Sequence, residues 1–345
     1  MDVEANPVIH LVASRASAQN SNSHGHKSET EGSPTSRRHD LETGSRTADE
    51  PPADEDTFPG DRGELPACIV LTGSFLTLFP SFGLMVSIGT LQEYWQFHQL
   101  SAYSSRDIGW ISGVFVYLAL ALGICFGPIF DRYGPRLIML LGSAAYIAMV
   151  FLLAECKVYW QFMLCLGLLG GPAAAALTTT SLAVVSHWFK VKRGLASGIA
   201  MVGNSFGGVF IPLVLRHCLP RYGYAWSVRI IAFVFLACLI VANVLVRSRF
   251  PPSPDAKKAS IFSLELFGQG DFTFLTVSLF GIEVVLFGAL GILPTYASIS
   301  TDYPAATGFY LIAVMNGSSC IGRILPGESQ SLEIQLSISI LPIYD

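Results

Sequence analysis

Eight long apolar runs dominate the sequence from residue 67 onward and constrain its fold more than any other feature. They span residues 67–91, 108–130, 137–154, 158–185, 194–215, 226–246, 272–294 and 305–325. A bilayer core about 30 Å thick needs about 20 apolar residues in a helix. The runs are continuous rather than alternating, which indicates helices and not the strands of a membrane barrel. We therefore predict an all-α integral membrane protein with about eight transmembrane helices.

The polar segments between and around these runs divide the chain. Residues 1–65 are rich in Ser, Glu, Asp, Thr, His and Arg, so we expect a disordered cytoplasmic tail there. A six-helix bundle is expected over 66–246, and a cytoplasmic linker follows at 247–271. The first two helices of a second bundle are expected over 272–327, before an atypical tail at 328–345.

Basic residues are distributed unequally among the loops. If the N-terminus lies in the cytoplasm and the spans alternate, nine Lys and Arg residues fall in inside loops and five in outside loops. Cytoplasmic loops carry such an excess, so we predict a cytoplasmic N-terminus, and we favour the plasma membrane over a vacuolar or other organelle membrane. The net charge is −4, and no Lys/Arg cluster interleaves with aromatics, which gives no basis for a nucleic-acid partner.

Small residues recur at a spacing of four within the runs. The pairs are Gly109/Gly113, Gly123/Gly127, Gly167/Gly171, Gly194/Gly198 and Gly203/Gly207. Such pairs let helix backbones approach closely in lipid. We interpret them as packing positions that do not identify a substrate.

A short charged loop joins the second and third runs. It reads GPIFDRYGPR, with glycines at Gly127 and Gly134 and the charges of Asp131, Arg132 and Arg136. Asp131 can pair with either arginine, or accept hydrogen bonds from the positively polarised N-terminus of a neighbouring helix. Such contacts can hold two helical bundles together at one membrane face. The alternative is an ordinary cytoplasmic turn that follows the positive-inside tendency.

The order and spacing of these five residues resemble the loop after the second helix in the major facilitator superfamily. The resemblance implies two related halves of six helices each that alternate access to a central site. It also implies that this loop is a conformational latch, in which Asp131 interacts with the opposite half and favours the outward-facing state.

Three further stretches resemble the monocarboxylate-transporter-like branch, especially its fungal members: 73–83, 187–208 and 322–327. The resemblance implies a small organic solute, such as a carboxylate, as the transported partner. Two departures stand out. The stretch 83–89 has no charge where animal members place a proton-coupling Lys, and Ser319 stands where they have an Asp. Proton coupling through that Lys and Asp is therefore not predicted.

Two ionisable residues fall inside the runs, where a charge costs about 2.5–3.5 kcal/mol at a helix centre. Glu283 lies near the middle of the seventh run and Arg323 near the end of the eighth. The functional interpretation places both at a central cavity, with Arg323 facing an organic anion and Glu283 a proton or cation. The alternatives are an Arg323 that snorkels to the surface and a protonated Glu283 satisfied between helices. Asn204 and Asn316 are further cavity candidates, although a lone Asn in a span also serves as an interhelical hydrogen-bonding group.

No catalytic triad, phosphate loop or metal-ligand spacing accompanies these residues. We therefore predict no enzymatic activity, no cofactor and no catalytic or metal-binding residue. The resemblance ends near Gly327, and 328–345 has neither a basic latch nor an apolar run of about 20 residues. We expect a C-terminally truncated transporter; the alternative is a non-transporting membrane remnant or a regulatory partner of a full-length relative.

Overall fold

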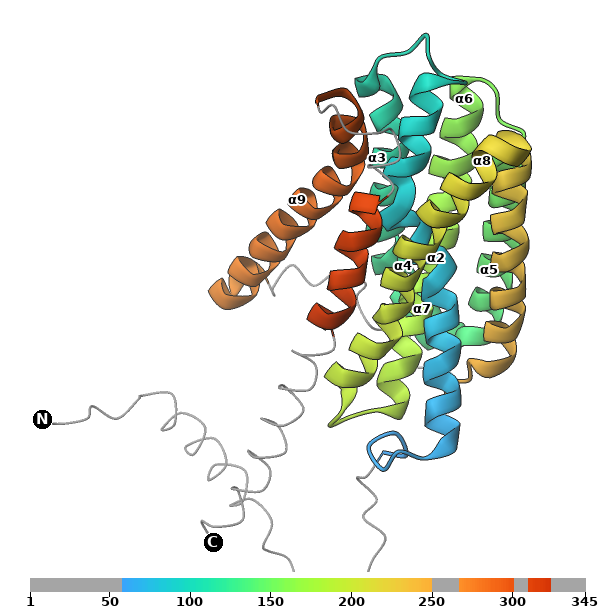
Figure 1. The fold of residues 1–345 in the computed structure, drawn as a ribbon. Helices are drawn as coiled ribbons and strands as arrows, with labels where there is room; N and C mark the ends of the chain where they lie inside the picture. Colours follow the sequence, from blue (N-terminus) through green and yellow to red (C-terminus); the bar gives the residue numbers. More distant parts are fainter. Residues whose placement is uncertain (1–57, 250–266, 301–309, 324–345) are drawn as a thin grey trace, which may run out of the picture. The chain divides into compact units, whose positions relative to one another are not determined.

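The computed structural model describes residues 58–249, 267–300 and 310–323, and the regular elements in these ranges are helices (Figure 1). The helices are α2 (Leu65–Phe97), α3 (Ser105–Ala121), α4 (Gly123–Tyr133), α5 (Pro135–Leu153), α6 (Tyr159–Phe162), the π-helix η1 (Met163–Gly170), α7 (Gly171–Trp188), α8 (Arg193–Leu245), α9 (Gly270–Ser300) and the helical segment 310–323, called helix 310–323 below. Most of the expected tail at 1–65 and of the linker at 247–271, both ends of the eighth run and all of 328–345 lie outside the described residues.

The helices follow the apolar runs. Within the described residues, six helical stretches are long and apolar enough to cross a membrane. The second run contains α3 and α4, and the fourth contains α6, η1 and α7. The fifth and sixth runs are merged in α8, which has 53 residues. The predicted all-α membrane bundle is confirmed.

A glycine separates the two spans inside α8. Gly223 has φ 71° and ψ 177°, a conformation that is not helical and that an L side chain rarely adopts. A straight helix of this length would extend about 80 Å, far beyond a bilayer core. The break at Gly223 lets the chain reverse, and Figure 1 shows the two parts of α8 running in opposite directions.

The α2 helix and the first part of α8 pack with their backbones in close contact. A Cβ placed on Gly207 would overlap the carbonyl oxygen of Phe79 and come within 2.8 Å of the Cα of Gly83. One turn earlier, a Cβ on Gly203 would overlap the carbonyl oxygen of Phe75. Lipid provides no hydrophobic force between helices, so association depends on close van der Waals contact of this kind. The predicted packing role of the Gly203/Gly207 pair is confirmed.

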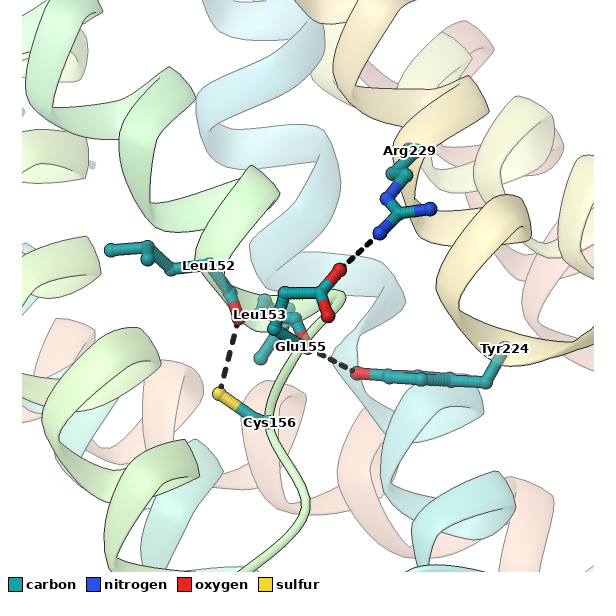
Figure 2. A network of polar contacts seen from close by, with 6 residues as sticks. All are labelled: Leu152, Leu153, Glu155, Cys156, Tyr224 and Arg229. Atoms are coloured by element: carbon teal, nitrogen blue, oxygen red, sulfur yellow. Dashed lines mark hydrogen bonds and ion pairs between the residues drawn. The ribbon is translucent and has the colours of Figure 1, made fainter.

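One end of the bundle is held by a network of polar contacts (Figure 2). The hydroxyl of Tyr224, just after the break in α8, donates to the carbonyl of Leu153 (3.1 Å). The same hydroxyl accepts a hydrogen bond from the indole of Trp95 of α2 (3.0 Å). Arg229 of α8 forms an ion pair with Glu155, in the loop after α5. These contacts join α2, α5 and the second part of α8.

At the opposite end, one carboxylate joins two segments of the chain. Asp61 precedes α2, and its carboxylate accepts hydrogen bonds from three consecutive backbone amides, those of Lys190 (3.2 Å), Val191 (3.1 Å) and Lys192 (2.9 Å). These amides directly precede α8, where the helix N-terminus carries partial positive charge. We call this contact the Asp61 clasp. It connects the start of α2 to the turn between α7 and α8, two segments far apart in the sequence.

Candidate functional site

A cavity of about 630 Å³ lies between α2, α3 and α9. Its walls are mainly apolar side chains and glycines, among them Ile88 of α2, Val116 of α3 and Phe280 and Phe287 of α9. Membrane-spanning helices from the first six spans and from the seventh meet at this place. The cavity can therefore hold a small, largely apolar molecule.

Four side chains with polar groups interrupt the apolar lining. Gln92 of α2 is buried, and its Oε1 accepts a hydrogen bond from the hydroxyl of Ser112 of α3 (2.7 Å). Tyr117 of α3 and Glu283 of α9 are exposed and line the same cavity. Glu283 also has an electrostatic interaction with Arg323. The cavity thus offers a carboxyl group, a phenol and an amide–hydroxyl pair to a bound molecule.

The sequence interpretation missed Gln92 and Ser112. The first apolar run was ended at residue 91, whereas α2 continues to Phe97 and buries both Gln92 and Glu93. Polar residues in the last turns of a transmembrane helix look like the start of a loop in the sequence. The aromatic residues that follow Gln92 and Glu93, at Tyr94, Trp95 and Phe97, are the signal that could have extended this run. Ser112 lies inside the second run, where a lone hydroxyl gives no signal.

Two of the other predicted candidates, Arg323 and Asn316, lie where α8 meets helix 310–323. Arg323 is half-buried and donates to the carbonyl of Met201 in α8 (3.0 Å) and to the hydroxyl of Ser319 (3.1 Å). Asn316 is buried, donates to the carbonyl of Ile312 (2.9 Å) and packs against Gly208 of α8. Both residues thus contact α8, at separate points, and neither lines the cavity formed by the described parts of α2, α3 and α9.

Asn204 is completely buried on α8, one turn before Gly208. Among the described residues, neither atom of its side-chain amide has a hydrogen-bond partner. A buried amide without a partner costs about 1–3 kcal/mol of folding stability. By contrast Asn243 donates to Ser143 of α5 (2.8 Å), which is the interhelical role expected for a lone Asn.

Of the two glycines predicted for the loop between α4 and α5, one has a backbone conformation that favours glycine. α4 ends at Tyr133, Gly134 follows with φ 74°, and Pro135 is the first residue of α5. A left-handed residue after a helix is usually Gly, and Pro is well suited to the first position of the next helix. Gly127 lies within α4 and does not have a positive φ. A Cβ there would have no neighbour within 4 Å in the described residues, so neither backbone conformation nor space requires glycine at this position.

The charges of this loop do not pair with one another. Asp131, Arg132 and Arg136 are exposed. In the ranges that the structure covers, no ion pair joins Asp131 to either arginine, and the Arg132 guanidinium lies 5.1 Å from the ring centroid of Tyr133 instead. Asp131 has an electrostatic interaction with His187 of α7. The latch role of Asp131 stays a prediction.

The fold and the cavity define a polytopic helical membrane protein with a solute-sized space between its spans. Residues 70–328 match the Major Facilitator Superfamily, and the chain belongs to this family. Members of this family transport solutes and are not enzymes.

Fungal proteins of this family resemble the chain along most of its length. MFS-type transporter 1 of Ophiocordyceps sp. (strain BCC 1869) is 34% identical over 276 residues, which cover 80% of this chain and 61% of the relative. The aspyridones efflux protein of Emericella nidulans is 34% identical over 278 residues, 80% of this chain and 56% of the relative. The fujikurins efflux protein of Gibberella fujikuroi is 33% identical over 272 residues, 79% of this chain and 58% of the relative. The chain spans about three-fifths of the length of these relatives.

Proposed function

We propose that the chain belongs to a secondary transporter that moves a small organic solute across the membrane by alternating access. The observation that carries this proposal is the cavity of about 630 Å³ between α2, α3 and α9. Its volume is in the range of about 300–1,000 Å³ that is usual for small-molecule sites. Transporters of this architecture bind solutes between their two halves, and α9 is the first helix after the six spans of the first half.

The lining of the cavity favours a solute with an apolar body and a hydrogen-bond donor or a positive charge. Glu283 is a carboxylate among apolar side chains, and it would repel a carboxylate bound beside it. Two relatives are named for the efflux of aspyridones and fujikurins, and we propose an efflux role in the plasma membrane by analogy. An organic anion, the second candidate, would instead require Arg323, whose planar guanidinium can bind a carboxylate at two points.

Glu283→Gln is expected to weaken binding of a donor-bearing solute by about 10- to 100-fold, because a hydrogen bond to a charged group contributes about 1.5–3 kcal/mol. The measurement is tryptophan-fluorescence titration of the full chain in lipid nanodiscs with aspyridones, fujikurins and simple aliphatic carboxylates. Glu64→Gln removes an exposed carboxylate that is not part of the cavity lining and is the matched control. If the chain binds simple carboxylates, and if Arg323→Lys abolishes this binding while Glu283→Gln leaves it unchanged, the result would favour an organic anion as the solute. No binding of any of these ligands by the unaltered chain would refute the proposed site.

We also propose that the end of the bundle with the Asp61 clasp faces the cytoplasm, because Lys190, Lys192 and Arg193 lie in that turn. A cysteine introduced at Lys192 should be protected from a membrane-impermeant maleimide in intact cells, and one at Lys157 should be labelled. Both variants are made with the exposed thiols Cys68 and Cys125 replaced by serine. The opposite labelling pattern would reverse the orientation.

A further inference from the structure

Three contacts join the first part of α8 to helix 310–323 in a regular antiparallel register. Arg216 lies over the ring of Tyr310, with its Cζ 4.2 Å from the ring centroid. Gly208 packs against Asn316. The carbonyl of Met201 accepts a hydrogen bond from Arg323 (3.0 Å). Along each helix, successive contacts are about two turns apart, so the outer contacts lie about 10 Å on either side of the middle one.

The middle contact is one of direct packing. A Cβ placed on Gly208 would overlap the side-chain amide of Asn316, so a larger residue there would displace that amide. The Nδ2 of Asn316 is turned back onto its own helix, where it donates to the carbonyl of Ile312 (2.9 Å). The side chain is buried and held against helix 310–323 as a compact block. The contact here is therefore made between α8 at Gly208 and a short side chain held on its own helix, and not by a long side chain.

The two outer contacts are of a different kind. Each is made by one long arginine side chain, on α8 at the Tyr310 end and on helix 310–323 at the Met201 end. A cation–π contact contributes about 0.5–2 kcal/mol, and a hydrogen bond from a charged donor about 1.5–3 kcal/mol. Either contact can break without unfolding a helix. A tilt of about 15° around the middle contact would move each end by about 3 Å, enough to break one contact while the other tightens.

We propose that Gly208 and Asn316 form the pivot of helix 310–323 on α8, and that Arg216 and Arg323 are positioning residues whose end contacts are released alternately. The Arg216–Tyr310 contact closes one end of this helix pair and the Arg323–Met201 contact closes the other. This proposal rests on the proposed alternating-access function and assigns its moving contact to named residues. It gives Arg323 a role at a helix interface in place of direct binding of a solute.

Double electron–electron resonance on the full chain in nanodiscs tests the pivot without any solute. Spin labels at the exposed Arg221 and the half-buried Leu311 report the Tyr310 end, and labels at the exposed Ile199 and Ile321 report the Met201 end. The native cysteines are replaced by serine or alanine, and each background is used only if its thermal unfolding matches that of the unlabelled chain.

The expected signature is reciprocal. Arg216→Gln should lengthen the distance at the Tyr310 end by about 2–4 Å and shorten or sharpen the distance at the Met201 end. Tyr310→Leu should reproduce this result, because it removes the same contact from the other helix. Arg323→Gln should give the opposite pattern, and Lys157→Gln, which removes a charge outside the helix pair, should change neither distance.

Gly208→Ala adds the Cβ that the pivot excludes, and it should lengthen both distances together. The proposal is wrong if an end variant changes only its own end, or if it lengthens both. Reciprocal distances in a chain that binds no solute would leave the pivot standing and refute the proposed function. Solute binding in a chain whose two distances do not change reciprocally would refute the pivot and leave the proposed function standing.

Discussion

Gly207→Leu is expected to prevent the first six spans from assembling, whereas the same change at Gly281 should be tolerated. At Gly207 the first added carbon already overlaps the carbonyl oxygen of Phe79 and approaches the Cα of Gly83. Both obstacles are backbone atoms, so no rotamer change relieves them. Forcing atoms into a packed interface costs about 1–3 kcal/mol, and a leucine against two backbones should exceed that range.

The measurement is the yield of monodisperse protein on size-exclusion chromatography in mild detergent, together with its thermal unfolding midpoint. Gly281 of α9 is the matched control, since a Cβ there would meet no neighbour within 4 Å among the described residues. Gly207→Ala should give an intermediate loss. Equal yields for the leucine variants at the two glycines would show that α2 and α8 do not approach as closely as the structure places them.

Asp61→Ala is expected to release the turn between α7 and α8. The carboxylate accepts from the amides of Lys190, Val191 and Lys192, and hydrogen bonds to a charged group are the strong ones. Asp61 is half-buried, so solvent screening reduces their value, and we expect a loss of about 2–3 kcal/mol for the three together.

Trypsin provides a direct measurement, because Lys190, Lys192 and Arg193 are its own cleavage sites within the clasped turn. Cleavage there should accelerate roughly tenfold or more in Asp61→Ala, as the population of the open turn rises. Glu64→Ala is the control, because Glu64 is exposed three residues away and makes no side-chain cap on α2. Unchanged cleavage in Asp61→Ala would mean that the turn is held by other contacts, such as that of the Trp188 indole with the carbonyl of Arg247 (2.8 Å).

The spacing of the glycine pairs predicts which residues share a helix face, but not whether that face contacts another helix. Gly203/Gly207 contacts α2 backbone, and a Cβ on Gly171 would come within 2.6 Å of Leu118 in α3. Gly113 and Gly127 stand in pairs of the same spacing, yet a Cβ on either would meet nothing within 4 Å in the described part of the chain. A spacing of four places two small residues on one helix face. Whether that face meets another helix depends on the arrangement of the other spans.

The candidate site shows the same division. Glu283 and Arg323 were singled out from the sequence because a charge inside an apolar run is conspicuous, but only Glu283 lines the cavity. Gln92 and Ser112 were not found, because an amide or a hydroxyl is ordinary near the end of a span, and their meeting requires α2 and α3 to be side by side. Only the folded chain brings Asp61 to three backbone amides about 130 residues away.

The sequence by itself determined that the chain forms apolar helices of bilayer length, and roughly where each begins and ends. In lipid every backbone amide and carbonyl must be satisfied within its own segment, so a continuous apolar run has one stable conformation. The tertiary structure alone decided which helices touch, because apolar surfaces gain little from preferring one another over lipid and the choice depends on the local fit of small residues. That choice placed Glu283 at the cavity with Gln92 and Ser112, and it placed Arg323 and Asn316 against α8.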